Sequence, residues 1–197
     1  VYTEDTNELI FTGTTDEQGM IIIKNLVAGK KYYILEKESA TGYLITDEKV
    51  SFEIKENGEV VKAEMKNKPI TGTLEFTKID LSTGTPLPNT LIEIYNDKDE
   101  LVFSGRTNEQ GMIIVKDIRY GRYYILEKEA PEGYILNEER MYFEIREDGE
   151  IVKATMENEK VVVEVPNTGI NDYHIIELIG GILIISGIGV VAYYVKK

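Results

Sequence analysis

Three polar residues, Lys78, Glu127 and Asn158, each end a run in which every second residue is apolar. Side chains two positions apart lie on the same face of a β-strand. The apolar residues that share these faces are Leu74 and Phe76, Tyr123 and Ile125, and Val152, Ala154 and Met156. Because apolar residues mark the buried face of a strand, the pattern predicts that an amine, a carboxyl group and a carboxamide point into a protein core.

These three groups suit one reaction if they meet. Desolvation favours the neutral forms of amines and carboxyl groups, so a buried Lys78 would be a nucleophile and Glu127 a proton carrier that polarises the Asn158 carbonyl. The product is a Lys–Asn amide with release of ammonia, and closing a loop of about 80 residues would stabilise the fold by roughly 4–5 kcal/mol. In the alternative interpretation, Lys78 extends to solvent at the rim and Asn158 merely ends a strand.

The chain contains two copies of one sequence pattern, 91 or 92 residues apart. The matching segments are 12–22 with 104–114, 33–38 with 124–129, and 61–67 with 152–158. A complete copy runs from about residue 70 to residue 162, and Tyr2 aligns with Tyr95. Residues 1–69 are therefore predicted to be a partial module that lacks its first strand, and we expect more protein before Val1.

The partial copy contains equivalents of two of the three polar residues. Glu36 corresponds to Glu127 and Asn67 to Asn158, but no equivalent of Lys78 lies within residues 1–69. We therefore expect Glu36 and Asn67 to have no lysine partner there, and we expect no amide cross-link in that half.

The local pattern throughout residues 1–164 is that of strands. Residues 50–54 and 141–145 alternate between apolar and polar types, and Asn57-Gly58 and Asp148-Gly149 follow them. These dipeptides are strong hairpin signals. Several short strands within about 90 residues predict an all-β fold of tandem β-sandwich modules.

The last residues differ in character from the rest of the chain. Leu178 to Val195 contain no charged side chain, and eighteen helical residues span about 27 Å, enough for a bilayer core. We expect one transmembrane helix over about 175–195, followed by the basic tail Lys196-Lys197. By the positive-inside rule the tail stays cytoplasmic and everything upstream lies outside the cell.

Several motifs resemble one family. The segments are Thr77-Lys78-Ile79-Asp80 with 83–87, the run 124–134, and Met156-Glu157-Asn158. In this order they resemble the Cna protein B-type (SpaA, prealbumin-like) modules of Gram-positive adhesins and pilins. The resemblance implies an isopeptide bond between Lys78 and Asn158, with Glu127 as the catalytic glutamate. The first copy departs from this pattern, because Ser39-Ala40 replaces Ala130-Pro131.

Residues 163–197 resemble a sorting signal of the LPXTG type. The motif Val165-Pro166-Asn167-Thr168-Gly169 is followed by the apolar span and the basic tail. The resemblance implies that a sortase cleaves between Thr168 and Gly169 and joins Thr168 to peptidoglycan or to a neighbouring pilin. Val165 stands where the motif usually has leucine, which leaves the sortase class open.

Composition excludes several other functions. The chain has no cysteine, one histidine and a net charge of −13. A chain this acidic is unsuited to binding nucleic acid, and we expect no metal or cofactor.

The sequence favours a function as the structural stalk and wall anchor of an adhesin or pilin. We expect the protein to be inserted in the membrane only until sortase acts. The alternative is that the modules themselves bind a host protein or carbohydrate. An N-terminal part could also supply a host ligand site, while an enzyme would need a polar pocket for which the sequence offers little.

Overall fold

The structure is a computed structural model and describes residues 1–162. This part of the chain consists of strands and turns, and none of it forms a helix with the length and apolar character needed to cross a membrane. The expected sorting motif, 165–169, and the expected transmembrane helix, about 175–195, lie outside the described residues.

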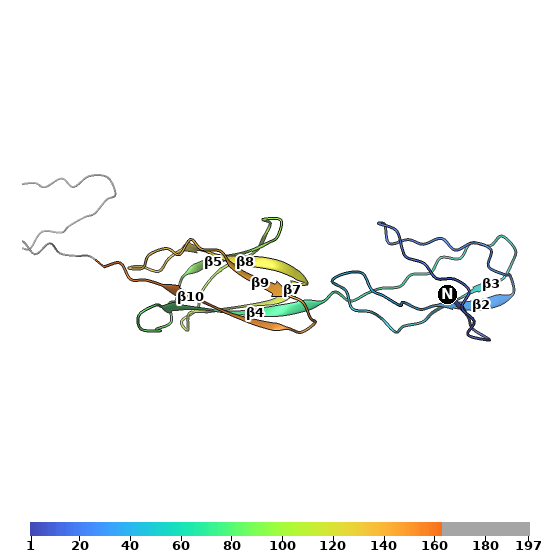
Figure 1. The fold of residues 1–197 in the computed structure, drawn as a ribbon, viewed down its shortest axis with the longest axis horizontal. Coiled ribbons are helices and arrows are strands. Elements are labelled where there is room, and N and C mark those ends of the chain that lie inside the picture. Colours follow the sequence, from blue (N-terminus) through green and yellow to red (C-terminus); the bar gives the residue numbers. More distant parts are fainter. Residues whose placement is uncertain (163–197) are drawn as a thin grey trace, which may run out of the picture. The chain divides into compact units, whose positions relative to one another are not determined.

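The second repeat, residues 70–162, forms two β-sheets (Figure 1). The first sheet has the order β10-β4-β7, with bounds Ile151–Asn158, Thr71–Asp80 and Met112–Arg119. The second has the order β6-β5-β8-β9, with bounds Leu101–Arg106, Leu91–Asn96, Gly121–Glu129 and Met141–Ile145. The expected all-β class is confirmed for the described residues.

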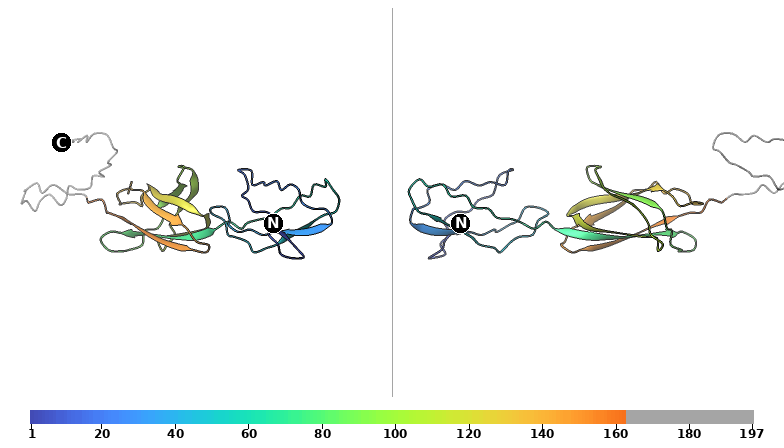
Figure 2. Two further views of the ribbon diagram at one scale, coloured as in Figure 1. Left: turned by 45° about the vertical axis from the view of Figure 1, so that its right-hand side comes forward. Right: turned by 180° about the vertical axis from the view of Figure 1, so that it is seen from behind.

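The hydrophobic core of the second repeat lies between these two sheets. Both sheets supply alternate side chains to it, as expected for a sandwich. The buried members are Leu74, Phe76, Ile92, Ile94, Ile113, Ile118, Tyr123, Ile125, Phe143, Ile145 and Met156. Figure 2 shows the two layers from further directions.

Strand β4 is the centre of the first sheet. It pairs in parallel with β10 and antiparallel with β7, which have no other strand partner among the described residues. Its residues alternate between half-buried and buried along its whole length, so the alternation predicted from the sequence is confirmed. Lys78 lies on the buried face, together with Phe76 and Asp80.

The hairpin predicted at Asp148-Gly149 is wrong, although the turn itself is present. Gly149 has a φ of 77°, which favours glycine, but β9 and β10 belong to different sheets. The Gly149 N–H donates to Thr71 O, and the Thr73 N–H donates to Glu150 O. The turn therefore passes the chain from the second sheet to the edge of β4.

The first repeat, residues 1–69, forms one sheet of order β1-β2-β3, with bounds Tyr2–Thr3, Lys30–Ile34 and Val50–Ile54. Tyr2 pairs with Tyr33 as Tyr95 pairs with Tyr124, so this sheet corresponds to β5-β8-β9. The segments equivalent to β7 and β10, residues 20–27 and 60–67, form no strand. Both would pair with a counterpart of β4. The hairpin expected at Asn57-Gly58 is absent, because the residues after this turn form no strand.

Candidate cross-linking site

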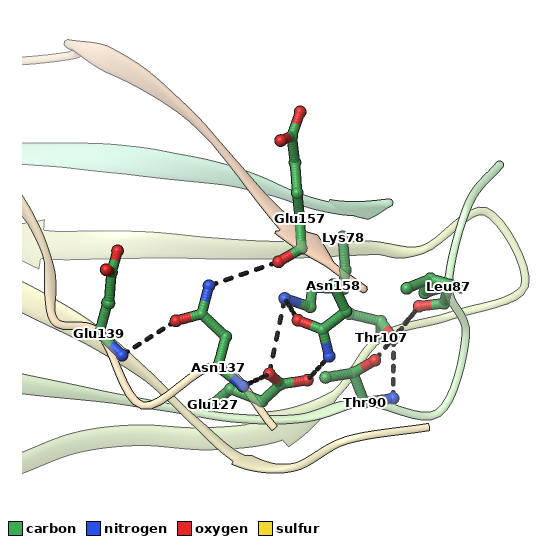
Figure 3. A network of polar contacts seen from close by, with 9 residues as sticks. All are labelled: Lys78, Leu87, Thr90, Thr107, Glu127, Asn137, Glu139, Glu157 and Asn158. Carbon is green, nitrogen blue, oxygen red and sulfur yellow. Dashed lines mark hydrogen bonds and ion pairs between the residues drawn. The ribbon is translucent and has the colours of Figure 1, made fainter. Parts of the chain in front are cut away.

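Three strands bring Lys78, Glu127 and Asn158 together inside the second repeat (Figure 3). The parallel register of β4 and β10 places Lys78 opposite Met156 and Asp80 opposite Asn158. Lys78 and Asn158 are therefore diagonal neighbours on the buried face, within reach of a long side chain. Glu127 enters from β8, in the opposite sheet.

The three side chains form a closed set of contacts. The Lys78 Nζ donates a hydrogen bond to Asn158 Oδ1, and Asn158 Nδ2 donates to Glu127 Oε1 at 2.7 Å. Lys78 Nζ lies 3.6 Å from Glu127 Oε2. Lys78 is 0 % exposed, Glu127 3 % and Asn158 2 %. The alternative in which Lys78 extends to solvent at the rim is therefore wrong.

Burial changes the acid–base behaviour of the lysine. Desolvation lowers the pKa of Lys78 from 10.5 to about 8, while the nearby charge of Glu127 acts in the opposite direction. The amine is therefore much closer to its neutral, nucleophilic form at neutral pH than an exposed lysine is.

Sequence reasoning missed a residue that holds the glutamate in place. The backbone N–H of Asn137 donates to Glu127 Oε2 at 2.7 Å. The Asn137 side chain is itself fixed, because its Nδ2 donates to Glu157 O and its Oδ1 accepts from the Glu139 N–H. Because a backbone N–H does not depend on the type of side chain, the sequence held no signal for the role of Asn137.

A second missed residue, Asp80, anchors the end of β4. Its buried carboxylate accepts hydrogen bonds from the backbone N–H groups of Ser82 and Thr83. It also accepts one from the Tyr134 hydroxyl at 2.8 Å and lies 3.1 Å from Lys160 Nζ. The Tyr134 hydrogen bond is the largest influence that holds the pKa of Asp80 well below its usual range. These contacts fix the strand two residues beyond Lys78.

The arrangement is suited to forming an amide between the lysine and the asparagine. The amine lies against the carboxamide that it would attack, and a carboxyl group contacts both the nucleophile and the leaving nitrogen. The three side chains are almost completely buried, which excludes water that would otherwise compete as nucleophile and solvate the amine.

The first repeat holds the corresponding glutamate and asparagine in contact. Asn67 Nδ2 lies 2.9 Å from Glu36 Oε1 and 2.7 Å from Glu36 Oε2, and it also donates to Leu44 O. The Thr46 N–H donates to Glu36 Oε2 at 2.9 Å, as Asn137 does for Glu127. The two residues expected to lack a lysine partner are thus already paired with each other.

Comparisons with known proteins agree with this architecture. The family described as SpaA, prealbumin-like fold domain, matches residues 1–69 and 72–160. The trypsin-resistant surface T6 protein of Streptococcus pyogenes serotype M6 is 28% identical over 127 residues, which cover 64% of this chain and 21% of that protein.

Two solved structures are also similar to this chain. The Bacillus anthracis TIE protein has a TM-score of 0.66 and 38% identity over 75% of this chain and 28% of that one. BcpA, the major pilin subunit of Bacillus cereus, has a TM-score of 0.45 and 26% identity over 57% of this chain and 37% of that one. The chain therefore spans less than half the length of each of these relatives.

Proposed function

This chain belongs to the family of SpaA prealbumin-like fold domains, and from that premise we propose that it is part of the structural stalk of a Gram-positive surface protein. The stalk belongs to an adhesin or a pilin subunit, and a Lys78–Asn158 isopeptide bond locks its complete repeat. The observation that carries this proposal is the buried contact of Lys78, Glu127 and Asn158.

The reaction proceeds by attack of Lys78 on the side chain of Asn158. Glu127 accepts a proton from Nζ, and the neutral amine then forms a bond to Asn158 Cγ. The Cγ–Nδ2 bond breaks after Nδ2 receives a proton through Glu127, which already contacts it at 2.7 Å. In all, the lysine ammonium and the carboxamide become one amide and one ammonium ion, and the carboxylate ends unchanged. The chain acts once on itself, so it is not an enzyme with a separate substrate.

Intact-mass measurement tests the bond directly. The chain cut after Val162, which retains the compact unit Val1–Val161, is expected to weigh one ammonia less than its sequence. Lys78→Ala, Glu127→Ala and Asn158→Ala are each expected to restore the full mass. Lys153→Ala is the matched control, because this lysine is on β10 with an exposed side chain. A full mass in the unaltered protein, or the ammonia deficit in all three variants, contradicts the proposal.

We also propose that the protein is anchored to the cell wall by sortase. The order of the motif 165–169, the apolar span and the basic tail supports this proposal. Kinship with a streptococcal surface protein agrees with a location outside the cell. Sortase would join Thr168 to peptidoglycan or to a neighbouring pilin, and the helix would hold the chain in the membrane until that step.

The alternative, ligand binding by the repeats themselves, has less support. It calls for a broad exposed aromatic surface on the sandwich. In residues 70–162 the exposed aromatic residues are Tyr120 and Tyr142, while Tyr123, Tyr124 and Phe143 are buried. Two exposed rings are too few to favour this function over a structural one.

A further inference from the structure

One tyrosine of β8 is buried on the side of its sheet that faces away from the hydrophobic core. Tyr123 and Ile125 belong to the core, so Tyr124 between them points to the outer face. Tyr124 is nevertheless only 5% exposed. The flanking strands supply part of its cover, because its ring stacks on Tyr95 of β5 and meets Tyr142 of β9, with ring centroids 5.2 Å and 5.9 Å apart.

Two charged residues complete the cover of Tyr124. Arg140 lies over the ring, with Cζ 4.3 Å from the ring centroid, and the Tyr124 hydroxyl donates to Asp99 Oδ1 at 2.7 Å. Arg140 Nη1 and Asp99 Oδ1 are 3.5 Å apart. An exposed ion pair alone would contribute little, but a cation over a buried ring and a hydrogen bond to its hydroxyl hold both partners in place. We call Asp99, Tyr124 and Arg140 the outer clamp.

The first repeat contains the same arrangement built from different residues. The equivalent tyrosine, Tyr33, is 7% exposed and donates to Asn7 Oδ1 at 3.1 Å. Lys49 stands in the place of Arg140, with Nζ 4.4 Å from the centroid of the Tyr33 ring. Asn7 and Asp99 share a left-handed backbone, with φ of 55° and 60°. The two repeats thus keep these contacts although two of the three residue types differ.

Arg140 connects the outer clamp to the segment that holds Glu127 (Figure 3). It ends the connection between β8 and β9, since β9 begins at Met141. Three residues before it, the Asn137 N–H donates to Glu127 Oε2 at 2.7 Å. The Glu139 N–H donates to Asn137 Oδ1 at 2.9 Å and closes the turn between them. The clamp therefore fixes one end of a short turn whose other end contacts the glutamate.

We propose that the outer clamp positions the groups of the cross-linking reaction from the far side of the sheet. By holding Arg140 it keeps the Asn137 N–H against Glu127, and so keeps that carboxyl group in contact with both reacting side chains. Tyr124 points outward from β8 whereas Glu127 lies on its core face, so the clamp residues are positioning residues and not catalytic ones. This inference rests on the proposed function, because it concerns the rate of the same reaction.

The test follows the loss of ammonia by mass while unreacted chain, cut after Val162, refolds, with folding monitored separately by tyrosine fluorescence. Arg140→Ala is expected to slow the reaction in folded molecules by roughly tenfold to a hundredfold, because a displacement of about 1 Å can have an effect of that size. Arg140→Lys, which copies Lys49, is expected to restore most of the rate. Arg122→Ala is the matched control, because it removes an exposed arginine paired with Glu144 on the same outer face.

A core variant separates positioning from a general loss of stability. Ile118→Val removes one methylene from the buried core in the opposite sheet and is expected to lower the denaturation midpoint without slowing the reaction. If Arg140→Ala slows the reaction no more than Ile118→Val does, or if Arg140→Lys fails to restore the rate, the positioning role is refuted and the proposed function stands.

Hydrogen exchange tests the clamp without the reaction. In a Lys78→Ala chain, which forms no bond, adding Arg140→Ala is expected to speed exchange of the Asn137 amide hydrogen, measured by NMR. Unchanged exchange refutes the clamp whether or not the bond forms in the unaltered chain. If the unaltered chain loses no ammonia, the proposed function is refuted, and the positioning role is refuted with it.

Discussion

The buried side chain of Lys78 illustrates the free-energy cost of removing a charged group from water. An ammonium ion enclosed by apolar residues and one carboxylate is costly, and removing one partner of such a pair leaves the other uncompensated. Formation of the proposed amide would convert both the amine and the carboxamide into one neutral, hydrogen-bonding group. The proposed reaction would therefore remove the energetic cost of burying the charged lysine.

The rate of bond formation should depend on pH in a way that reveals where the proton is held. The pKa of Lys78 is lowered to about 8, so below that pH the lysine holds the proton that it would pass to Glu127, and above it the lysine loses this proton to solvent. Because the proposed reaction transfers that proton through Glu127 to the leaving nitrogen, we expect a level rate just below pH 8. Above it we expect a fall of about tenfold per pH unit.

Refolding provides the measurement. Chain recovered unfolded and unreacted from inclusion bodies is refolded at a series of pH values, and the loss of ammonia is followed by mass. A rate that instead rises up to about pH 8 would mean that Lys78 gives its proton to solvent and that Glu127 does not carry it.

Glu127→Gln tests whether the ability of Glu127 to accept a proton, rather than its size, is needed for the cross-link. The amide keeps the size of the side chain but cannot accept the proton of Lys78, so we expect no cross-link. The proposed bond would close a loop between residues 80 positions apart, and its loss should lower the free energy of unfolding by roughly 4–5 kcal/mol. Glu109→Gln, a change at an exposed glutamate of the same repeat, should leave the bond and the denaturation midpoint unaltered. An unchanged midpoint in Glu127→Gln would contradict the expected stabilisation.

At this scale the sequence predicts the direction of side chains well. Alternation in the three strands correctly placed Lys78, Glu127 and Asn158 on buried faces. It did not predict that Asn137 holds Glu127, because that contact uses a backbone N–H whose position depends on the connection between β8 and β9. Nor did it predict the role of Asp80, whose partners Tyr134 and Lys160 are distant in sequence.

At the scale of elements, the position of β4 depends on its close approach to the turn before β7. The Lys78 N–H donates to Gly111 O, and the Leu87 N–H donates to Lys78 O. Gly111 has a φ of 68°, and a side chain there would meet the β4 backbone. The turn thus determines how deeply the strand that bears the lysine can sit.

Gly111→Ala should therefore be more harmful than Gly19→Ala. Both changes force alanine into the left-handed region at a cost of about 1–2 kcal/mol, but only Gly111 adds a clash with β4 worth roughly 1–3 kcal/mol. Denaturant unfolding measures the first effect, and the ammonia deficit shows whether Lys78 still reaches Asn158. Equal losses of stability in the two variants would contradict the proposed role of this close approach.

The sequence predicts turns more reliably than it predicts strand partners. Asp148-Gly149 does turn the chain, as a positive φ at Gly149 shows, but the strands on either side lie in different sheets. Local dipeptides fix local backbone angles. Which strand pairs with which depends on the whole sandwich, and the parallel pairing of β4 with β10 joins residues from opposite ends of the repeat.

At the scale of the whole molecule, the proposed sorting motif predicts where the protein is found in the cell. The Thr168→Ala change removes the residue that sortase is proposed to join to the wall. We expect the protein to shift from the wall fraction to the membrane fraction and the medium, as seen by fractionation and immunoblotting. Asn167→Ala is the matched control, because this position of the motif is variable. Persistent wall attachment of Thr168→Ala would refute the sorting proposal.

The parallel pairing of β4 and β10 also decides how the second repeat would respond to tension. Force applied to its two ends enters at Thr71, at the start of β4, and leaves after Asn158, at the end of β10. With Lys78 joined to Asn158, the load runs along the first eight residues of β4, crosses the amide and leaves the repeat. The intervening residues lie off the load path. Fully extended they would measure about 270 Å, at roughly 3.4 Å per residue, but this length cannot be added to the repeat by unfolding. A repeat built in this way behaves as an inextensible link whose sandwich is mechanically shielded.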